Sequence, residues 1–181
     1  MTAKINNRII LHQGRSFSFV KENVTLDNGA TVDLDLVRHP GAAAIVPFIS
    51  HDRLIMLRQY RHAIGRPIWE IPAGTLDPDE NPLECAKREL IEETGYSGRQ
   101  WEKLGEITPV PGYSDERIHI FVATHLTPAE QNLDVDEVLD VHQVSFEKTI
   151  EMIEKGQIQD SKTISGLYYA SLWLKRSAAR K

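Results

Sequence analysis

The sequence predicts an α/β fold in which helices pack on a sheet, with a small antiparallel sheet at the N-terminus. Three observations lead to this prediction. Residues 16–38 alternate in polarity as strands do, apolar runs typical of strands recur from residue 42, and helix patterns lie among and after them. A chain of 181 residues that is 41% hydrophobic can bury one core. We expect an N-terminal β subdomain at residues 1–40 and a main domain at residues 41–181.

Strands dominate the first third of the chain. Asn28 and Gly29 lie in the stretch LDNGA, where a tight hairpin turn needs positive φ angles. The apolar runs at residues 42–49 (AAAIVPFI) and 53–60 (RLIMLRQY) are separated by the polar SHD, which favours two strands paired with each other. Residues 65–82 are rich in proline and glycine and are predicted to form a loop.

A helix is predicted between Asn81 and Gly95. Asn81 suits the N-cap and Pro82 the first helical position, and Glu84 follows at the third. Gly95 suits the residue that ends a helix, because glycine adopts the left-handed conformation without strain. The sequence therefore predicts a well-delimited helix after the loop.

The second half of the chain is predicted to contain strands at residues 101–107, 117–123 and 138–144, and helices at about residues 146–155 and 161–176. Long connections lie between these strands, at residues 107–116 and 126–137. Long loops in compact domains are often functional.

Charge and composition exclude several classes of protein. The net charge of -5 and the pI of about 5.8 argue against a surface for nucleic acid or anionic lipid. No stretch approaches the roughly 18 apolar residues that span a bilayer, and the N-terminus lacks a cleavage signal. A single cysteine, Cys85, excludes an internal disulfide and suits a reducing cytoplasm, where we expect the protein to reside.

Two residue types that bind metals are expected to have ordinary roles. Cys85 lies within the helix pattern and is interpreted as a small buried apolar residue. His51, His119 and His125 are scattered without the spacing of metal ligands and are interpreted as ordinary surface or core residues.

Three glutamates crowd the predicted helix. Glu89 is three residues before Glu92 and four before Glu93, so the three carboxylates share a face opposite the apolar stripe. A solvated helix face is one interpretation, with Arg88 softening the repulsion. The other is a site for a divalent cation, because Mg²⁺ prefers carboxylates, water and phosphate oxygens. The glycine-rich loop before the helix favours the cation site.

This stretch resembles the signature of the Nudix family, Gx5Ex7REUxEExGU, in which U is a bulky apolar residue. The matching positions are Gly74, Glu80, Arg88, Glu89, Leu90, Glu92, Glu93, Gly95 and Tyr96. The resemblance implies an α/β/α sandwich with a mixed sheet. It also implies a loop and helix that bind Mg²⁺ or Mn²⁺ and hydrolyse nucleoside diphosphates linked to another moiety.

The resemblance assigns roles to the matched residues. Glu89 and Glu93 would be the principal metal ligands, and Glu92 an additional or water-bridged ligand. The backbone carbonyl of Ala73 would be a further ligand. The remaining polar or glycine positions of the signature would support the loop and orient the acids; these are Gly74, Glu80 and Arg88.

The flanking loops resemble the ADP-ribose pyrophosphatase branch of the family. Pro111 falls 16 residues after Gly95, within PVPGYSDER, and the segments LRQYRHAIG and IWEIPAG are also similar to that branch. An ordinary turn at Pro111 and Gly112 is the alternative. Arg61, at a strand end, could face a diphosphate, and Glu116 could contact a metal or a ribose hydroxyl. The expected substrate contacts in these segments are Arg61, Pro111, Gly112, Ser114, Asp115 and Glu116.

Hydrolysis also needs a base for the attacking water. In similar enzymes a glutamate on a late loop acts as the base or as a metal ligand. Glu137 in LDVDEVLDV is the best positional match, with Asp136 and Asp134 behind it. A solvated acidic loop is the alternative interpretation. The catalytic residues expected from the resemblance are therefore Glu137, Glu93 and Glu92.

The N-terminal strands are expected to build a homodimer. In similar enzymes two subunits exchange these strands, so that each active site borrows residues from its partner. Arg15, Phe17 and Phe19 are candidates for such borrowed contacts. Alternation of polarity would equally place the two phenylalanines in a core.

The expected reaction is Mg²⁺-dependent hydrolysis of ADP-ribose to AMP and ribose 5-phosphate, with a small-molecule substrate and neither nucleic acid nor membrane as partner. A GDP-mannose preference is the main alternative, and ADP-glucose is a further candidate substrate. A non-catalytic ADP-ribose sensor would carry a DNA-binding extension and an eroded signature, and neither is expected here. An enzyme acting on modified dNTPs would release pyrophosphate. Treating Glu93 as an exposed acid, we expect Glu93→Gln to remove activity and leave the fold intact.

Overall fold

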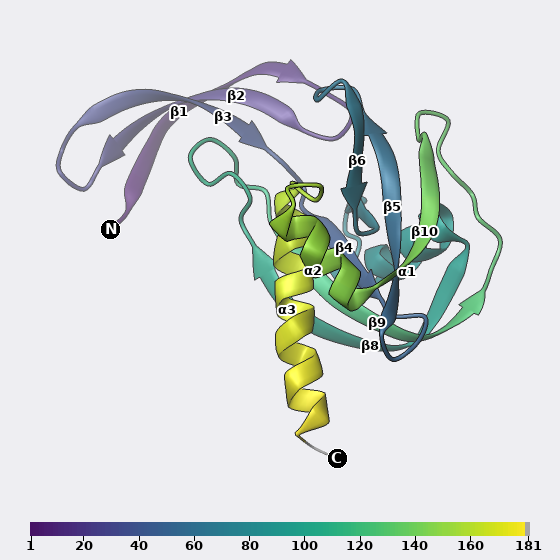
Figure 1. Ribbon diagram of the computed structural model, residues 1–181. Coiled ribbons are helices and arrows are strands. Elements are labelled where there is room, and N and C mark those ends of the chain that lie inside the picture. The colour runs from purple at the N-terminus through teal and green to yellow at the C-terminus, as the bar shows by residue number, and fades with distance from the viewer. Residues whose placement is uncertain (180–181) are drawn as a thin grey trace.

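The computed structural model describes residues 1–179 and confirms the α/β fold (Figure 1). Three sheets and three helices make up the described chain. The strands are β1 (Ala3–Gln13), β2 (Ser18–Leu26), β3 (Thr31–Arg38), β4 (Ala42–Pro47), β5 (Arg53–Arg61), β6 (Arg66–Glu70), β7 (Ala73–Thr75), β8 (Tyr96–Ile107), β9 (Ile118–Pro128) and β10 (Leu139–Ser145). The helices are α1 (Pro82–Thr94), α2 (Phe146–Glu154) and α3 (Ser161–Ala178).

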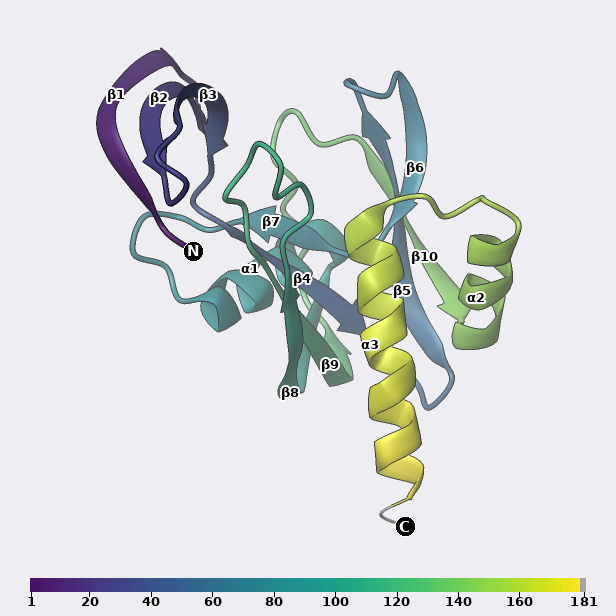
Figure 2. The same ribbon diagram turned by 90° about the vertical axis from the view of Figure 1, so that its left-hand side faces the viewer.

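The N-terminal sheet has the order β1-β2-β3 and stands to one side of the other sheets (Figure 2). The hairpin predicted at Asn28 and Gly29 is confirmed, and Gly29 has a φ of 81°. Strand β1 was not predicted, because its residues are exposed on both faces and carry no alternation of polarity. Glu22 of β2 is buried in this sheet and forms ion pairs with Arg8 and Arg38.

The mixed sheet has the order β7-β4-β9-β8, with β4 parallel to β9 and antiparallel to β7. Successive side chains of a strand point to opposite faces, so β4 serves two cores. Ala43 and Ile45 pack toward α1, whereas Ala44 and Val46 belong to the cluster on the α3 side. Figure 2 shows β4 between α1 and α3. This arrangement confirms the mixed sheet of an α/β/α sandwich.

The predicted pairing of residues 42–49 with residues 53–60 is wrong. Strand β5 lies in a second sheet, ordered β10-β5-β6. It is hydrogen-bonded to the β4 segment next to the turn, through the bridge between Phe48 and Leu54 and the Ile49 amide, which donates to the Arg53 carbonyl at 2.9 Å. Both edges of β4 are already occupied by β7 and β9. The turn SHD therefore carries the chain from one sheet to the other.

The predicted loop at residues 65–82 is also wrong in part, since it contains β6 and β7. Strand β6 pairs with β5 in the register Leu57 to Glu70, and it tolerates Pro67 because it lies at the edge of its sheet. Strand β7 pairs with β4 through Ala44 and Ala73. These two strands carry the chain from the second sheet to the start of α1.

Helix α1 confirms the predicted caps. The Asn81 side chain accepts a hydrogen bond from the Leu83 amide at 2.9 Å, Pro82 opens the helix, and Gly95 ends it with a φ of 69°. Its apolar side buries Ala86 and Leu90 against the mixed sheet.

The other predicted elements are confirmed with shifted ends. Strand β8 begins five residues earlier than expected, at Tyr96, and β9 ends five residues later, at Pro128. The two closing helices begin at N-caps, Ser145 for α2 and Asp160 for α3. None of the helices within residues 1–179 combines the length and the apolar character needed to cross a membrane.

Candidate active site

A cleft of about 930 Å³ opens where β5, β7, α1 and the loop between β9 and β10 meet. These elements converge because β7 connects the second sheet to the mixed sheet directly below α1. The cleft is lined by Arg15, Ser16, Pro40, residues 59–61, residues 73–78, Arg88, Glu89, Glu92, Asn132, Asp134, Asp136 and Glu137.

Glu89 lies at the floor of this cleft, against the backbone of Gly74. It is 8% exposed, and its carboxylate covers the position that a Cβ atom at Gly74 would occupy. Burial raises the pKa of Glu89 to about 7, although the neighbouring charge of Arg88 acts in the opposite direction. The charges of Glu92 and Glu137 raise this pKa further. The first glycine of the signature is therefore required for space beneath the acid.

Glu93 is the most deeply buried acid of α1. It is 1% exposed, which corrects the expectation of an exposed side chain, and its Oε2 accepts a hydrogen bond from the Ala73 amide at 2.8 Å. Burial, and next the charge of Glu89, raise the pKa of Glu93 well above its ordinary value. No ion pair within the described chain includes Glu93. A buried carboxylate next to a second one is electrostatically suited to a cation.

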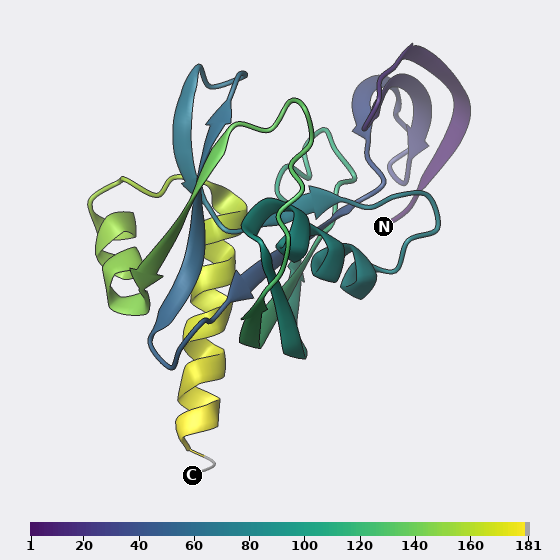
Figure 3. The same ribbon diagram turned by 90° about the vertical axis from the view of Figure 1, so that its right-hand side faces the viewer.

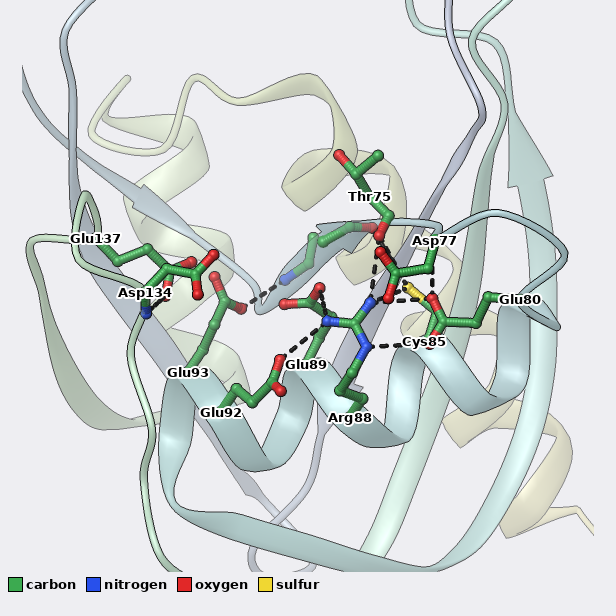
Figure 4. A network of polar contacts seen from close by, with 12 residues as sticks. Thr75, Asp77, Glu80, Cys85, Arg88, Glu89, Glu92, Glu93, Asp134 and Glu137 are labelled. Atoms are coloured by element: carbon green, nitrogen blue, oxygen red, sulfur yellow. Dashed lines mark hydrogen bonds and ion pairs between the residues drawn. The ribbon is translucent and has the colours of Figure 1, made fainter. Parts of the chain in front are cut away.

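Arg88 holds the other acids of the signature (Figure 4). Its Nε and Nη2 atoms donate to the two oxygens of Glu80, each at 3.0 Å. Its Nη1 atom donates to Glu89 at 2.6 Å and to Glu92 at 2.9 Å. The hydrogen bond from Arg88 lowers the pKa of Glu80 to about 2. Glu80 Oε2 also accepts from the Asp77 amide at 3.0 Å, so Arg88 and Glu80 tie the loop before α1 to the helix.

The donors at this site suit a hard divalent cation, the cofactor class implied by the resemblance. Glu89 and Glu93 contribute buried carboxylates, and Glu92 lies beside them on the cleft wall. Within residues 1–179, however, no three Asp, Glu, His or Cys side chains are arranged to hold one metal ion together. Arg88 holds both Glu89 and Glu92. Joint ligation therefore requires these two carboxylates to move relative to Arg88, and the ligand set stays a prediction.

Arg61 lines the cleft, at the end of β5 where it was predicted. Its Nε and Nη2 donate to Glu70 at 3.0 and 2.6 Å. Lys162 of α3 also donates to Glu70, at 2.8 Å. Burial alone would raise the pKa of Glu70, but the bonds and charges of Arg61 and Lys162 outweigh it and hold that pKa below its ordinary value. Sequence reasoning missed Glu70 and Lys162, because only the fold brings α3 to β6.

The loop between β9 and β10 is attached to the C-terminal end of α1. Gln131 donates to the Glu93 carbonyl at 2.6 Å, and the Asn132 amide donates to the Glu92 carbonyl at 3.1 Å. The side chain of Glu137 accepts from the Asp134 amide at 2.9 Å. Figure 3 shows this loop passing beside α1 on its way to β10. The loop therefore brings Glu137 toward Glu93, as Figure 4 shows.

Arg15 closes one side of the cleft. It lies in the turn between β1 and β2, and its Nη2 atom contacts Oδ2 of Asp136 at 2.6 Å. Both side chains are well exposed, at 77% for Arg15 and 55% for Asp136. Arg15 thus lines the cleft of its own chain, and a contact borrowed from a partner stays a prediction. Phe17 and Phe19 are exposed and do not line the cleft.

The proline-containing loop lies outside the cleft. Asp115 accepts from the His39 amide and from Arg38, both at 2.9 Å, which ties this loop to the end of β3. Glu116 is within 3.9 Å of the His39 ring. The residues of this loop that were expected to bind substrate are not among the residues lining the cleft, and their role stays a prediction; they are Pro111, Gly112, Ser114, Asp115 and Glu116.

Cys85 and the three histidines are not among the residues that line the cleft. Cys85 is buried, as predicted, and burial raises the pKa of its thiol to about 12. His119 lies near Glu106, at 3.0 Å. His51 and His125 line a separate cavity of about 660 Å³ beside α3.

The buried glutamates of α1, with Glu89 packed against Gly74 of β7, define the class of protein, and comparisons with known proteins agree. Residues 37–166 match the family model described as NUDIX domain, so the chain belongs to the Nudix family. It is 38% identical over 164 residues to the methanol dehydrogenase activator of Bacillus methanolicus, covering 90% of this chain and 89% of that protein. It is 35% identical over 164 residues to the ADP-ribose pyrophosphatase of Bacillus subtilis strain 168, with the same coverage of 90% and 89%.

Two further likenesses bear on the substrate class and the fold. The chain is 33% identical over 171 residues to the GDP-mannose pyrophosphatase of Cronobacter sakazakii, covering 85% of this chain and 88% of that protein. A crystal structure of an ADP compounds hydrolase superposes with a TM-score of 0.85 at 24% identity, covering 98% of this chain and 96% of that one. The structural likeness shows the shared fold. Members of this family use a divalent cation.

Proposed function

We propose that the protein is a Mg²⁺-dependent Nudix pyrophosphohydrolase that cleaves the diphosphate bond of ADP-ribose and related nucleoside diphosphate sugars. One water is consumed for each diphosphate cleaved, and ADP-ribose gives AMP and ribose 5-phosphate. The observation that carries the proposal is a pair of neighbouring buried carboxylates on α1. Glu89 lines a cleft that also includes Arg61, and Glu93 is buried next to Glu89. The relatives named ADP-ribose pyrophosphatase and GDP-mannose pyrophosphatase support this substrate class.

The residues that would hold Mg²⁺ are Glu89 and Glu93, with Glu92 and the carbonyl of Ala73 as further donors. Mn²⁺ prefers the same oxygen ligands. When bound, the cation neutralises charge on the diphosphate oxygens and makes water a better nucleophile. Burial raises the pKa of both Glu89 and Glu93, and a bound cation would favour their ionised forms, which supports a cation at this position.

The side chains of the cleft divide the remaining work. Arg61 is oriented by Glu70 and binds a phosphate of the substrate through its remaining N–H groups. Glu137, on the loop that is attached to α1, accepts the proton of the attacking water. Arg88 holds Glu89 and Glu92 until these carboxylates move to bind the cation. In this proposal the diphosphate is held between Arg61 and the acids, which line the same cleft.

The experiment is product analysis with Mg²⁺ over ADP-ribose, ADP-glucose, GDP-mannose, diadenosine polyphosphates and dNTPs. AMP and ribose 5-phosphate from ADP-ribose at the highest kcat/KM would support the proposal. A higher kcat/KM for GDP-mannose would favour the GDP-mannose enzyme, to which the chain is also similar. Pyrophosphate from dNTPs with untouched sugar nucleotides would overturn the substrate class, and binding of ADP-ribose without turnover would indicate a sensor. Hydrolysis in ¹⁸O-water locates the attacked phosphorus.

A homodimer built on residues 1–40 belongs to the same proposal. The N-terminal sheet exposes large apolar side chains that a single chain leaves in contact with water, among them Ile9, Ile10 and Leu11. Exposed apolar patches of this kind support an interface between copies. Light scattering should give the mass of a dimer, and Ile10→Glu should shift it toward that of a monomer. We also place the protein in the cytoplasm, in keeping with its single buried thiol.

A further inference from the structure

Lys162, the second residue of α3, holds a positive charge in a nearly buried position. Its side chain is 13% exposed, and its ammonium group donates to Glu70 at 2.8 Å and to Asp160 at 3.0 Å. A buried charge is costly unless it is paired and hydrogen-bonded, so these two carboxylates fix the ammonium group in place. Lys162 is not among the residues that line the cleft. Its nearest route to a ligand in the cleft is therefore through a side chain that it contacts.

Glu70 is that side chain, because it joins Lys162 to Arg61. The Oε2 atom of Glu70 accepts from Arg61 Nη2 at 2.6 Å and from the Lys162 ammonium at 2.8 Å, while Oε1 accepts from Arg61 Nε at 3.0 Å. Two parallel bonds of this kind fix the plane of a guanidinium group. Arg61 lines the cleft, and no hydrogen bond within residues 1–179 uses its Nη1 atom. Glu70 thus sets the direction in which Arg61 presents its remaining N–H groups.

The start of α3 is itself tied to the segment that carries Glu70. Asp160, the N-cap of α3, accepts from the Thr163 amide at 2.9 Å, and the Thr163 hydroxyl accepts from the Ile71 amide at 3.0 Å. Ile71 follows Glu70 directly in the chain. The helix is thus joined to the end of β6 at two successive residues, and Lys162 contacts Glu70 from a fixed base.

The charges of this cluster explain why a second cation is needed. Arg61 and Lys162 are positive, and Glu70 and Asp160 are negative, so the four groups balance. Without Lys162 the cluster would carry a net negative charge, and Arg61 alone would neutralise Glu70. A diphosphate is itself an anion, and charges interact strongly where little water separates them. Lys162 therefore leaves more of the positive charge of Arg61 available to a phosphate.

We propose that Lys162 is a positioning residue for diphosphate binding, which shares Glu70 with Arg61 and so keeps the guanidinium group of Arg61 oriented and charged toward a phosphate in the cleft. This inference rests on the proposed function and extends the binding machinery to a residue of α3 that does not line the cleft. The contact that carries it is the Oε2 atom of Glu70, which Arg61 and Lys162 both use.

The test compares Lys162→Met with Lys162→Arg in the full chain. Methionine is an unbranched side chain without the charge, whereas arginine retains the charge and the donors. Lys162→Gln is a second neutral variant, used if the methionine brings the Tm below the assay temperature. Glu70→Gln and the double variant Lys162→Met/Glu70→Gln show whether the effect passes through Glu70. Lys148→Met is the matched control, because it removes a lysine from an exposed pair with Glu151 on α2.

The readouts are kcat and KM for ADP-ribose with saturating Mg²⁺, and the Tm. The Kd values for ADP-ribose and for inorganic pyrophosphate are measured by calorimetry without metal. The Mg²⁺ concentration that gives half-maximal activity is also measured, because the charge of Lys162 acts on Glu93 as well as on Glu70.

Lys162→Met is expected to raise the KM and both Kd values about fivefold and to change kcat less than about twofold. Affinity is affected more than kcat because the phosphate at Arg61 is charged before and during cleavage. Lys162→Arg should recover most of the affinity. In the Glu70→Gln background, Lys162→Met should have little further effect, and Lys148→Met should leave KM and Kd unchanged.

Unchanged KM and Kd values in Lys162→Met, or a lower Tm as the only change, would overturn the inference. So would an equally large effect of Lys162→Met after Glu70 has been replaced, because the shared contact would then be irrelevant. A changed Mg²⁺ requirement with unchanged Kd values would place the effect at Glu93 and would also overturn it. If the wild type does not hydrolyse ADP-ribose, the proposed function fails, while the Kd values, that for pyrophosphate included, still test Lys162.

Discussion

The carboxylate of Glu89 lies directly over the α-carbon of Gly74, in the space that any side chain at residue 74 would need. The two residues belong to different elements, β7 and α1, and are separated by 14 residues along the chain. Gly74 therefore sets the depth at which an acid of α1 reaches into the cleft. This contact gives a physical reason for the glycine that opens the signature.

Gly74→Ala is expected to lower kcat/KM for ADP-ribose at least about a hundredfold, because the new methyl group displaces the Glu89 carboxylate from the cleft floor. Gly166→Ala is the control, since its Cβ would meet Ile71 Cδ1 at 2.7 Å within the core. The control should lower Tm with a smaller effect on kcat/KM, because it strains packing away from the acids. Steady-state kinetics and thermal melting measure both effects. Normal turnover in Gly74→Ala would show that the position of Glu89 is unimportant.

Glu93→Gln should lower kcat about a hundredfold or more and leave Tm equal to or above that of the wild type. The amide fills the same buried space and can still accept the bond from Ala73, while a buried ionisable group is removed. Mg²⁺ or Mn²⁺ should raise the Tm of the wild type and should raise that of the variant much less. Glu84→Gln, an exposed acid of the same helix, is the control. An equal Tm increase by metal in Glu93→Gln would remove Glu93 from the ligand set.

Acid should destabilise the wild type partly through Glu80. Its pKa in the fold is about 2, below the ordinary value of 4.5, because of the hydrogen bond from Arg88. A depressed pKa contributes stability that is complete above about pH 4.5 and is lost as the pH falls toward 2. Glu80→Gln should therefore lower Tm at pH 7 and show a shallower fall in Tm between pH 4.5 and pH 2. Parallel curves of Tm against pH for the two proteins would contradict this prediction.

The contact between Arg15 and Asp136 should influence turnover without supporting the fold. Arg15→Gln and Asp136→Asn are each expected to lower kcat/KM about twofold to fivefold, because the loop that carries Glu137 loses an attachment across the cleft. The double variant should resemble either single variant, since both remove the same contact. Lys148→Gln, which breaks an exposed pair on α2, is the control. Additive losses would indicate that the two residues act separately, for example with Arg15 on the substrate.

The sequence was most informative where local rules decide structure. The N-cap at Asn81, the proline after it and the glycine at residue 95 identify α1 to within a residue at each end. The hairpin at Asn28 and Gly29 was equally predictable, because a tight turn restricts backbone angles to residues that tolerate positive φ. The helical spacing of Glu89, Glu92 and Glu93 predicted the acidic face of the cleft.

Strand pairing was predicted less well, since apolar runs reveal burial and not partners. Residues 42–49 and 53–60 are both strands, but they belong to different sheets. Strands β6 and β7 were missed because proline and glycine usually indicate a loop. Proline is tolerated in β6 because β6 lies at the edge of its sheet, and glycine is needed in β7 because Glu89 of α1 lies against it. Strand β1 gave no alternation because both of its faces are exposed.

By itself, the sequence determined the helix that carries the acids and the residues at its ends, because capping and helical spacing act over a few residues. The resemblance to the Nudix signature indicated the reaction class. Only the tertiary structure decided that Glu93 is buried and that Arg15 meets Asp136. Burial and hydrogen bonding at these positions depend on segments up to 121 residues apart in the chain, as for Arg15 and Asp136. Such contacts form only when the sheets and α1 have packed together.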